Sequence, residues 1–167
     1  GRQEHLPDPG HDIQALMGEA LNSKQHVSCG AVVYRARDGV IEVLAMHRTG
    51  TDSWHLPKGT QEPNESIEET ARREILEETG YPITITRYLG SLESIIKRHE
   101  GVVPKLTHYF IAQTTASHQQ QKSDSEHDTV VFLPAEKLKT LLRNKRIKNY
   151  EKEYLILEKF LVLGVPS

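Results

Sequence analysis

The segment that decides the fold runs from Gly59 to Tyr81 and reads GTQEPNESIEETARREILEETGY. Ser66 is followed three positions later by Glu69, which is the spacing of a capping box, so a helix is predicted to begin there. Gly80 is a typical residue just past a helix end, so the helix should run to about Thr79. The segment is therefore predicted to form a loop, a helix and a second loop.

Three carboxylates gather on one face of this predicted helix. Glu74, Glu77 and Glu78 stand at positions i, i+3 and i+4, so they fall within an arc of about 100°. Like charges this close repel each other, and a bound Mg²⁺ or Mn²⁺, which prefer oxygen ligands, would remove the conflict. Glu65 can join the cluster, and Arg73 can pair with a carboxylate and fix its orientation. A glutamate pair by itself is usually only a solvated helix face.

The whole segment resembles the Nudix box, the signature of the Nudix hydrolases. The pattern is glycine, five spacers, Glu, seven spacers, Arg-Glu, an aliphatic residue, one spacer, Glu-Glu, one spacer and glycine. The residues that match it are Gly59, Glu65, Arg73, Glu74, Ile75, Glu77, Glu78 and Gly80. Seven identities at fixed spacing arise by chance at about one in 10⁸ per start site. Tyr81 departs from the aliphatic residue that the pattern prefers next, although it is apolar enough to pack there.

The resemblance implies a fold, a reaction and a set of roles. The fold is α+β, with a mixed β-sheet sandwiched between α-helices (α/β/α). In the reaction, water attacks a phosphorus of a diphosphate linkage while Mg²⁺ or Mn²⁺ neutralises the developing charge. By position, the metal ligands would be Glu74, Glu77, Glu78 and the backbone carbonyl of Lys58. Arg73, Glu74 and Glu78 would also belong to the catalytic set.

A further acidic residue, Glu126, lies on a late polar segment, SEHDTVVFLPAEKL. In the family, a glutamate on this loop often supplies another metal ligand or the general base, so the resemblance gives Glu126 either role. The alternative is a solvated acid in a polar loop. His127 and Asp128 are weaker candidates for the same role.

Four residues outside the box are candidates for contact with the substrate. Lys58 and Arg48 can bind phosphate oxygens, against the ordinary alternative of surface cations. Trp54 and Tyr109 can stack on a base, although packing in the core or the sheet is the commoner use of such residues. Residues 143–152 hold five basic side chains, which belong either to a solvated surface or to a contact with distal phosphates.

The rest of the chain predicts one domain, residues 26–167, after an N-terminal extension, residues 1–25, in which 11–21 form a short helix. Apolar alternation and turn residues predict strands at 27–35, 41–47, 54–57, 83–96, 105–113 and 129–133. Residues 116–128 are predicted to form a mobile polar loop, and helices are predicted at 134–142 and 150–163.

Composition narrows the class of protein. The chain has 167 residues with 21 basic and 23 acidic side chains, so no stable nucleic-acid partner is expected. Cys29 is the only cysteine, which excludes an internal disulfide and a cysteine-based zinc cluster. The sequence holds no 18-residue apolar run and no signal-peptide pattern at its start, so no membrane contact and a cytoplasmic location are expected. The oligomeric state stays open.

The box leaves the substrate open. The motifs WHLPKG, YLGSL, THYFIAQ and FLPAEKLKTLL resemble the diadenosine tetraphosphate hydrolase branch, so a dinucleoside polyphosphate is the first choice. The alternatives are a (d)NTP of the nucleotide pool, as for MutT-like enzymes, and ADP-ribose or a diphosphoinositol polyphosphate. A different class, the non-catalytic nucleotide-binding regulators on this fold, usually lacks box glutamates, all of which are present here.

Overall fold

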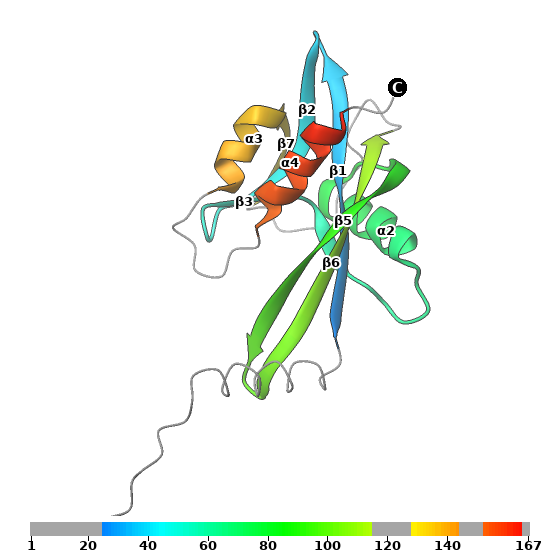
Figure 1. The fold of residues 1–167 in the computed structure, drawn as a ribbon, viewed down its shortest axis with the longest axis vertical. Helices are drawn as coiled ribbons and strands as arrows, with labels where there is room; N and C mark the ends of the chain where they lie inside the picture. The colour runs from blue at the N-terminus through cyan, green and yellow to red at the C-terminus, as the bar shows by residue number, and fades with distance from the viewer. Residues whose placement is uncertain (1–24, 115–127, 144–151, 165–167) are drawn as a thin grey trace, which may run out of the picture.

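The computed structural model describes residues 25–114, 128–143 and 152–164 (Figure 1). Its elements, in chain order, are β1 (His26–Arg37), β2 (Val40–Arg48), β3 (Ser53–His55), β4 (Lys58–Thr60), α2 (Ile67–Thr79), β5 (Ile83–Arg98), β6 (Gly101–Thr114), β7 (Asp128–Pro134), α3 (Ala135–Leu142) and α4 (Glu153–Leu163).

Within these ranges, seven strands form one sheet with β1 at its centre. The main path of the sheet is β3-β2-β1-β6-β5, with β7 along β2 and β4 along β1. On one edge β1 pairs in parallel with β6, and on the other it pairs antiparallel with β2 and with β4. This arrangement places β4, and with it the start of the box, against the middle of the sheet.

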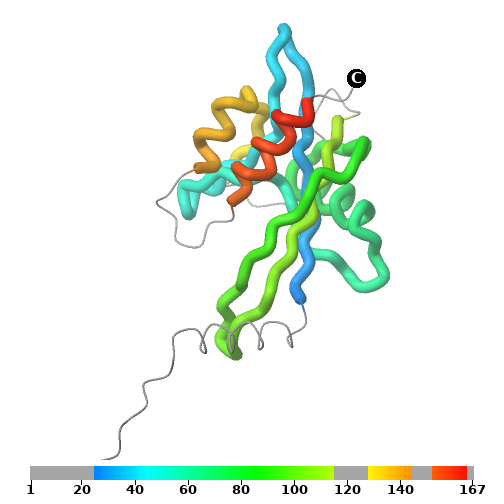
Figure 2. Tube along the Cα trace, in the orientation of Figure 1, coloured from blue at the N-terminus to red at the C-terminus, as the bar shows by residue number. Residues whose placement is uncertain are grey.

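Successive residues of β1 point to opposite faces of the sheet, as in any strand. Ala31 and Val33 belong to a core layer beneath α2, whereas Val32 and Tyr34 belong to a second layer beneath α3 and α4. Figures 1 and 2 show α2 on one side of the sheet and α3 and α4 on the other. The predicted α+β fold, a mixed sheet between helices, is therefore confirmed.

The cap chemistry of α2 is as predicted, and the turn between β1 and β2 is equally local. The Ser66 hydroxyl accepts a hydrogen bond from the Glu69 backbone N–H at 3.1 Å, and α2 ends at Gly80 in the left-handed conformation, with φ 74°. Asp38 and Gly39 between β1 and β2 both have positive φ, of 51° and 78°. Two such residues make the turn whose twist matches a hairpin, so this junction is decided locally.

The structure differs from the prediction at two elements. Lys58–Thr60 forms the short strand β4, which is too short to show an alternating pattern and exists because it pairs with β1. The last helix begins at Glu153 and not at residue 150, since Lys152 before it has a ψ of 55°. The predicted helix at 11–21 lies outside the described residues, as does the predicted loop at 116–128 except for Asp128, which is the first residue of β7. No helix of the described part is long and apolar enough to cross a membrane.

Candidate active site

Arg73 anchors the loop that precedes α2. Its Nε and Nη2 donate to the two carboxylate oxygens of Glu65 at 2.7 and 2.8 Å, and Nη2 also donates to the Thr60 carbonyl at 2.9 Å. The Thr70 hydroxyl and the Glu62 backbone N–H donate to the same carboxylate at 2.7 and 3.1 Å. These bonds, those from Arg73 first, lower the pKa of Glu65 to about 2. Glu65 therefore fastens the loop to α2, and its oxygens are occupied by donors.

The other side of Arg73 contacts the acidic face of α2. Nη1 donates to Glu74 Oε1 at 2.8 Å and to Glu77 Oε2 at 3.3 Å. One guanidinium thus bridges the loop carboxylate and two carboxylates of the helix. The pairing predicted for Arg73 is present, and it orients Glu74, whose side chain is 16% exposed.

Gly59 of β4 lies directly against Glu74. A Cβ atom added to Gly59 would stand 2.0 Å from both Cδ and Oε2 of Glu74. No side chain fits there, which explains physically why the segment begins with glycine. The strand and the helix pack closely enough that the Glu74 carboxylate lies on the backbone of β4.

Glu78 extends this contact by one helical turn. Its Oε2 accepts a hydrogen bond from the Lys58 backbone N–H at 3.2 Å. Burial, together with the charge of Glu74, raises the pKa of Glu78 to about 7, although that N–H and the charges of Arg48 and Lys58 act in the opposite direction. The fold therefore brings β2, β4 and α2 together around one partly desolvated carboxylate.

This donor set fits a hard divalent cation. Glu74, Glu77 and Glu78 supply carboxylate oxygens from one helix face, and the Lys58 carbonyl is an oxygen of the adjoining strand. Among the described residues, no three Asp, Glu, His or Cys side chains are already grouped as a metal site. Arg73 donates to one oxygen of Glu74 and one oxygen of Glu77, so this pairing orients both carboxylates without engaging their second oxygens.

The predicted substrate contacts are only partly brought together. Arg48, at the end of β2, lies near Glu78 and pairs in register with Asp128 at the start of β7. Trp54 of β3 is half-buried against the α3–α4 core, with its ring 4.9 Å from that of His47. Phosphate contact by Arg48 and base stacking on Trp54 stay predictions.

Tyr109 and Lys58 face α4. Tyr109 has no exposed surface and its hydroxyl donates to Glu153 at 2.7 Å, so the predicted stacking of a base on Tyr109 is wrong for this conformation. The Lys58 side chain is 12% exposed, and its Nζ lies 3.6 Å from the same glutamate. Phosphate contact by Lys58 therefore stays a prediction that competes with this ion pair.

Glu153 is not among the residues that the sequence predicts. From the sequence it is an acidic residue in the first turn of an apolar helix, and such residues are commonly exposed at the surface. In the fold it is buried, with 2% exposure. Burial would raise its pKa, but Lys58, His55 and Tyr109 outweigh burial and the pKa of Glu153 is lowered.

Glu126 and His127, and most of the basic stretch at 143–152, lie outside the described residues. Asp128 opens β7 opposite Arg48, so Glu126 precedes by two positions a residue that is paired at the site.

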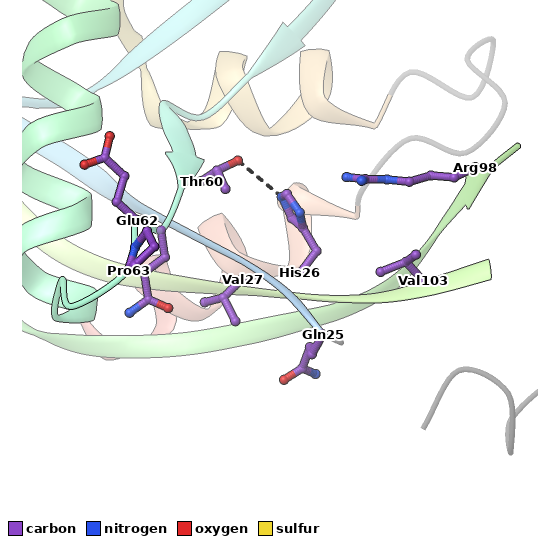
Figure 3. Close-up of a pocket in the computed structure, with 9 residues that line it drawn as sticks. Gln25, His26, Val27, Thr60, Glu62, Pro63, Arg98 and Val103 are labelled. Carbon is purple, nitrogen blue, oxygen red and sulfur yellow. Dashed lines mark hydrogen bonds between the residues drawn. The ribbon is translucent and has the colours of Figure 1, made fainter. Parts of the chain in front are cut away.

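A hollow of about 550 Å³ lies beside the loop between β4 and α2 (Figure 3). Residues 25–27 and 60–63, with Arg98 and Val103 of the β5–β6 hairpin, line it. The His26 ring and the Thr60 hydroxyl are 3.2 Å apart at its wall. Glu74, Glu77 and Glu78 do not line this hollow, so it does not contain the acidic cluster.

Comparison with known proteins agrees with this geometry. An 8-oxo-(d)GTP phosphatase of Mycolicibacterium smegmatis is 30% identical over 141 residues, which are 77% of this chain and 42% of that protein. This chain thus spans less than half the length of that relative. The asymmetrical bis(5'-nucleosyl)-tetraphosphatase of Mus musculus is 26% identical over 128 residues, covering 72% of this chain and 87% of the mouse protein.

A solved structure shares the fold. The binary complex of the C. elegans Ap4A hydrolase superposes with a TM-score of 0.64 at 23% identity, covering 83% of this chain and 96% of that one. Residues 24–154 match the NUDIX domain family, which is most of the chain. The acidic helix, its glycine contact and this match lead to one conclusion: the chain belongs to the NUDIX family.

Proposed function

We propose that this protein hydrolyses a diphosphate linkage in a nucleoside polyphosphate and requires Mg²⁺ or Mn²⁺ to do so. The observation that carries the proposal is the acidic face of α2. Glu74 lies against Gly59, and Glu78 is bonded to the Lys58 backbone N–H. Carboxylates placed in this way repel a polyanionic substrate unless a cation lies between them, and Arg48 is one cation that is already near.

The chain's own residues account for binding and positioning. A bound divalent cation would neutralise negative charge on the reacting phosphate. Glu74, Glu77 and Glu78, with the Lys58 carbonyl, would hold it. Arg73 keeps the loop and the first of these carboxylates in place through its bonds to Glu65 and Glu74.

In the reaction, the oxygen of water forms a bond to phosphorus and the bridging P–O bond breaks. The water proton passes to a carboxylate base, and the leaving phosphate departs with the bond's electron pair. We assign the base to Glu126, because it stands two positions in the sequence before Asp128, which opens β7 opposite Arg48. The same residue is a candidate for a further metal ligand.

For the substrate, a dinucleoside tetraphosphate is the first choice. The similarity to a protein named bis(5'-nucleosyl)-tetraphosphatase supports it, as do the motifs outside the box. Such a substrate carries about four negative charges, more than one metal ion neutralises, so additional cations must reach the distal phosphates. Arg48, Lys58 and the basic residues at 145–152 are the candidates.

The second candidate is a (d)NTP, since one relative is named an 8-oxo-(d)GTP phosphatase. Kinetics on the metal-stripped full chain, with diadenosine tetraphosphate, dGTP and 8-oxo-dGTP side by side, would decide between them. We expect turnover only after Mg²⁺ or Mn²⁺ is restored, and a higher kcat/KM for diadenosine tetraphosphate.

Three results would contradict parts of this proposal. Full activity in excess EDTA would refute metal dependence. A preference of about tenfold or more for a dNTP, equivalent to roughly 1.4 kcal/mol, would reject the substrate branch and leave the hydrolase assignment intact. Nucleotide binding without turnover of any diphosphate in either metal would favour a non-catalytic regulator.

A further inference from the structure

The buried carboxylate of Glu153 has partners in two segments of the chain, residues 55–58 and Tyr109 of β6. Its Oε1 accepts the Leu56 backbone N–H at 3.3 Å and lies 3.6 Å from His55 Nδ1. Its Oε2 accepts the Tyr109 hydroxyl at 2.7 Å and lies 3.6 Å from Lys58 Nζ. A buried carboxylate is costly unless it is paired and hydrogen-bonded, so this arrangement needs every partner it has.

Most of these partners belong to residues 55–58, the link between β3 and β4. That link packs against Gly30 of β1, where an added Cβ would stand 2.3 Å from the Pro57 carbonyl oxygen and 2.7 Å from Lys58 Cβ. Gly30 pairs in register with Lys58 on one side and Tyr109 on the other. Lys58 and Tyr109 therefore lie on either side of Gly30, and Glu153 contacts the side chains of both.

Lys58 is consequently held from both faces of the sheet. On the α2 face its backbone N–H donates to Glu78, and on the α4 face its ammonium lies beside Glu153. The Leu56 N–H bond holds the same link two residues earlier. If Glu153 were displaced, the link would lose its contacts on the α4 face. Only the bond from the Lys58 backbone N–H to Glu78 would then hold it against α2.

We propose that Glu153 is a positioning residue for the reaction, holding residues 55–58 so that the Lys58 backbone meets Glu78 and the metal position. Glu153 itself touches neither metal nor substrate. It acts through the link, and it makes the C-terminal helix a part of the active-site scaffold. This inference rests on the proposed function, and part of its test is independent of turnover.

The test compares Glu153→Gln with Glu153→Asp and Glu158→Gln in the full chain. Gln keeps the side-chain volume but removes the negative charge that faces Lys58. It also replaces one accepting oxygen by an N–H₂ group, which is a donor and cannot accept from the donors around it. Asp keeps the charge. Glu158 lies on the same helix, half-buried and paired with Arg143 at the surface, so its substitution controls for a change on α4.

Hydrogen exchange of residues 54–60 is the readout that needs no activity. In Glu153→Gln we expect exchange there to become about tenfold faster, because hydrogen bonds to a neutral amide are weaker than those to a carboxylate and the link opens more often. Exchange in β2 and β7 should be unchanged. Mn²⁺ affinity by calorimetry and kcat should each fall about 10- to 100-fold, with KM within about twofold. Asp should recover part of each loss, and Glu158→Gln should behave as wild type.

Unchanged exchange at 54–60 in folded Glu153→Gln, or equal losses in Glu158→Gln, would overturn the proposal. Uniformly faster exchange with normal kcat and Mn²⁺ affinity would also overturn it, because it would show a purely structural role. If Glu153→Gln does not fold, Tyr109→Phe decides, since it removes one donor and keeps the ring. Normal exchange and kcat in that variant would then reject positioning.

A wild-type protein without turnover or Mn²⁺ binding would refute the proposed function, whereas the exchange result would still decide the role of Glu153 in holding the link.

Discussion

Replacing Gly59 by alanine should displace the Glu74 carboxylate and lower the catalytic rate while the protein stays folded. The added Cβ would stand 2.0 Å from the Glu74 carboxylate, whereas ordinary van der Waals contact begins at 3.4 Å, so the carboxylate must move by about 1.4 Å. Glu74 is on a helix whose backbone is fixed by core contacts of Ala71 and Ile75. The displacement therefore falls mainly on the carboxylate and on its bond to Arg73.

The two expected magnitudes differ. Overpacking of this kind costs about 1–3 kcal/mol of folding free energy, which most domains survive. A misplacement of about 1 Å in a reacting constellation can cost about 10²-fold in rate, or roughly 2.7 kcal/mol of barrier. We expect Gly59→Ala to remain folded at 25 °C and to lose about 10²-fold in kcat.

Gly50→Ala is the matched control, because a Cβ at Gly50 meets nothing within 4 Å. Both variants would be compared with wild type by thermal melting and by initial rates at saturating Mg²⁺. A folded Gly59→Ala enzyme with a rate within about twofold of Gly50→Ala would refute the reasoning, since 0.4 kcal/mol or so is too little for a displaced metal ligand.

Three further predictions concern single glutamates. Glu78→Gln should lower the rate by orders of magnitude while melting temperature is kept or raised, since the change removes a charge that burial disfavours; a near-normal rate would contradict the ligand assignment. Glu126→Gln should lower kcat by about 10²–10⁴ if Glu126 is the base, and an unchanged pH–rate profile would return that role to a box glutamate. The folded-state pKa of Glu65 is about 2, below its ordinary value of 4.5, so its stabilisation is complete above pH 4.5 and lost as pH falls toward 2. Urea unfolding should therefore show wild type more stable than Glu65→Gln at pH 6, and a gap that does not narrow by pH 3 would count against this.

The parts of the fold that were predictable are those decided by neighbours in sequence. Ser66 caps α2 through a residue three positions away, and Asp38-Gly39 forms a turn from its own backbone preferences. The order of carboxylates on α2 follows from helical periodicity alone. The box glutamates were therefore placed on one face before any tertiary contact was known.

The parts that were not predictable depend on partners distant in sequence. The hydrogen bonds of Glu153 reach Tyr109 and Leu56, 44 and 97 positions away, so nothing near Glu153 marks it as buried. The burial of Tyr109 could not be predicted for the same reason, because its neighbours in the strand do not show which face of the sheet α4 will cover. The strand β4 exists only through its pairing with Ser28–Gly30 of β1.

The parallel pairing of β1 with β6 has a consequence for how the chain reaches this structure. Partners such as His26 and Lys105 are separated by about eighty residues, so the loop that joins them must close before their contacts can form. Domains dominated by such non-local pairings fold on the scale of milliseconds to seconds, much more slowly than helical bundles. During that interval, the helix with its capping box can form early and fluctuate alone, with its three carboxylates in water. The repulsion among them is then weak, and it becomes costly only when β4 closes over them as the sheet completes.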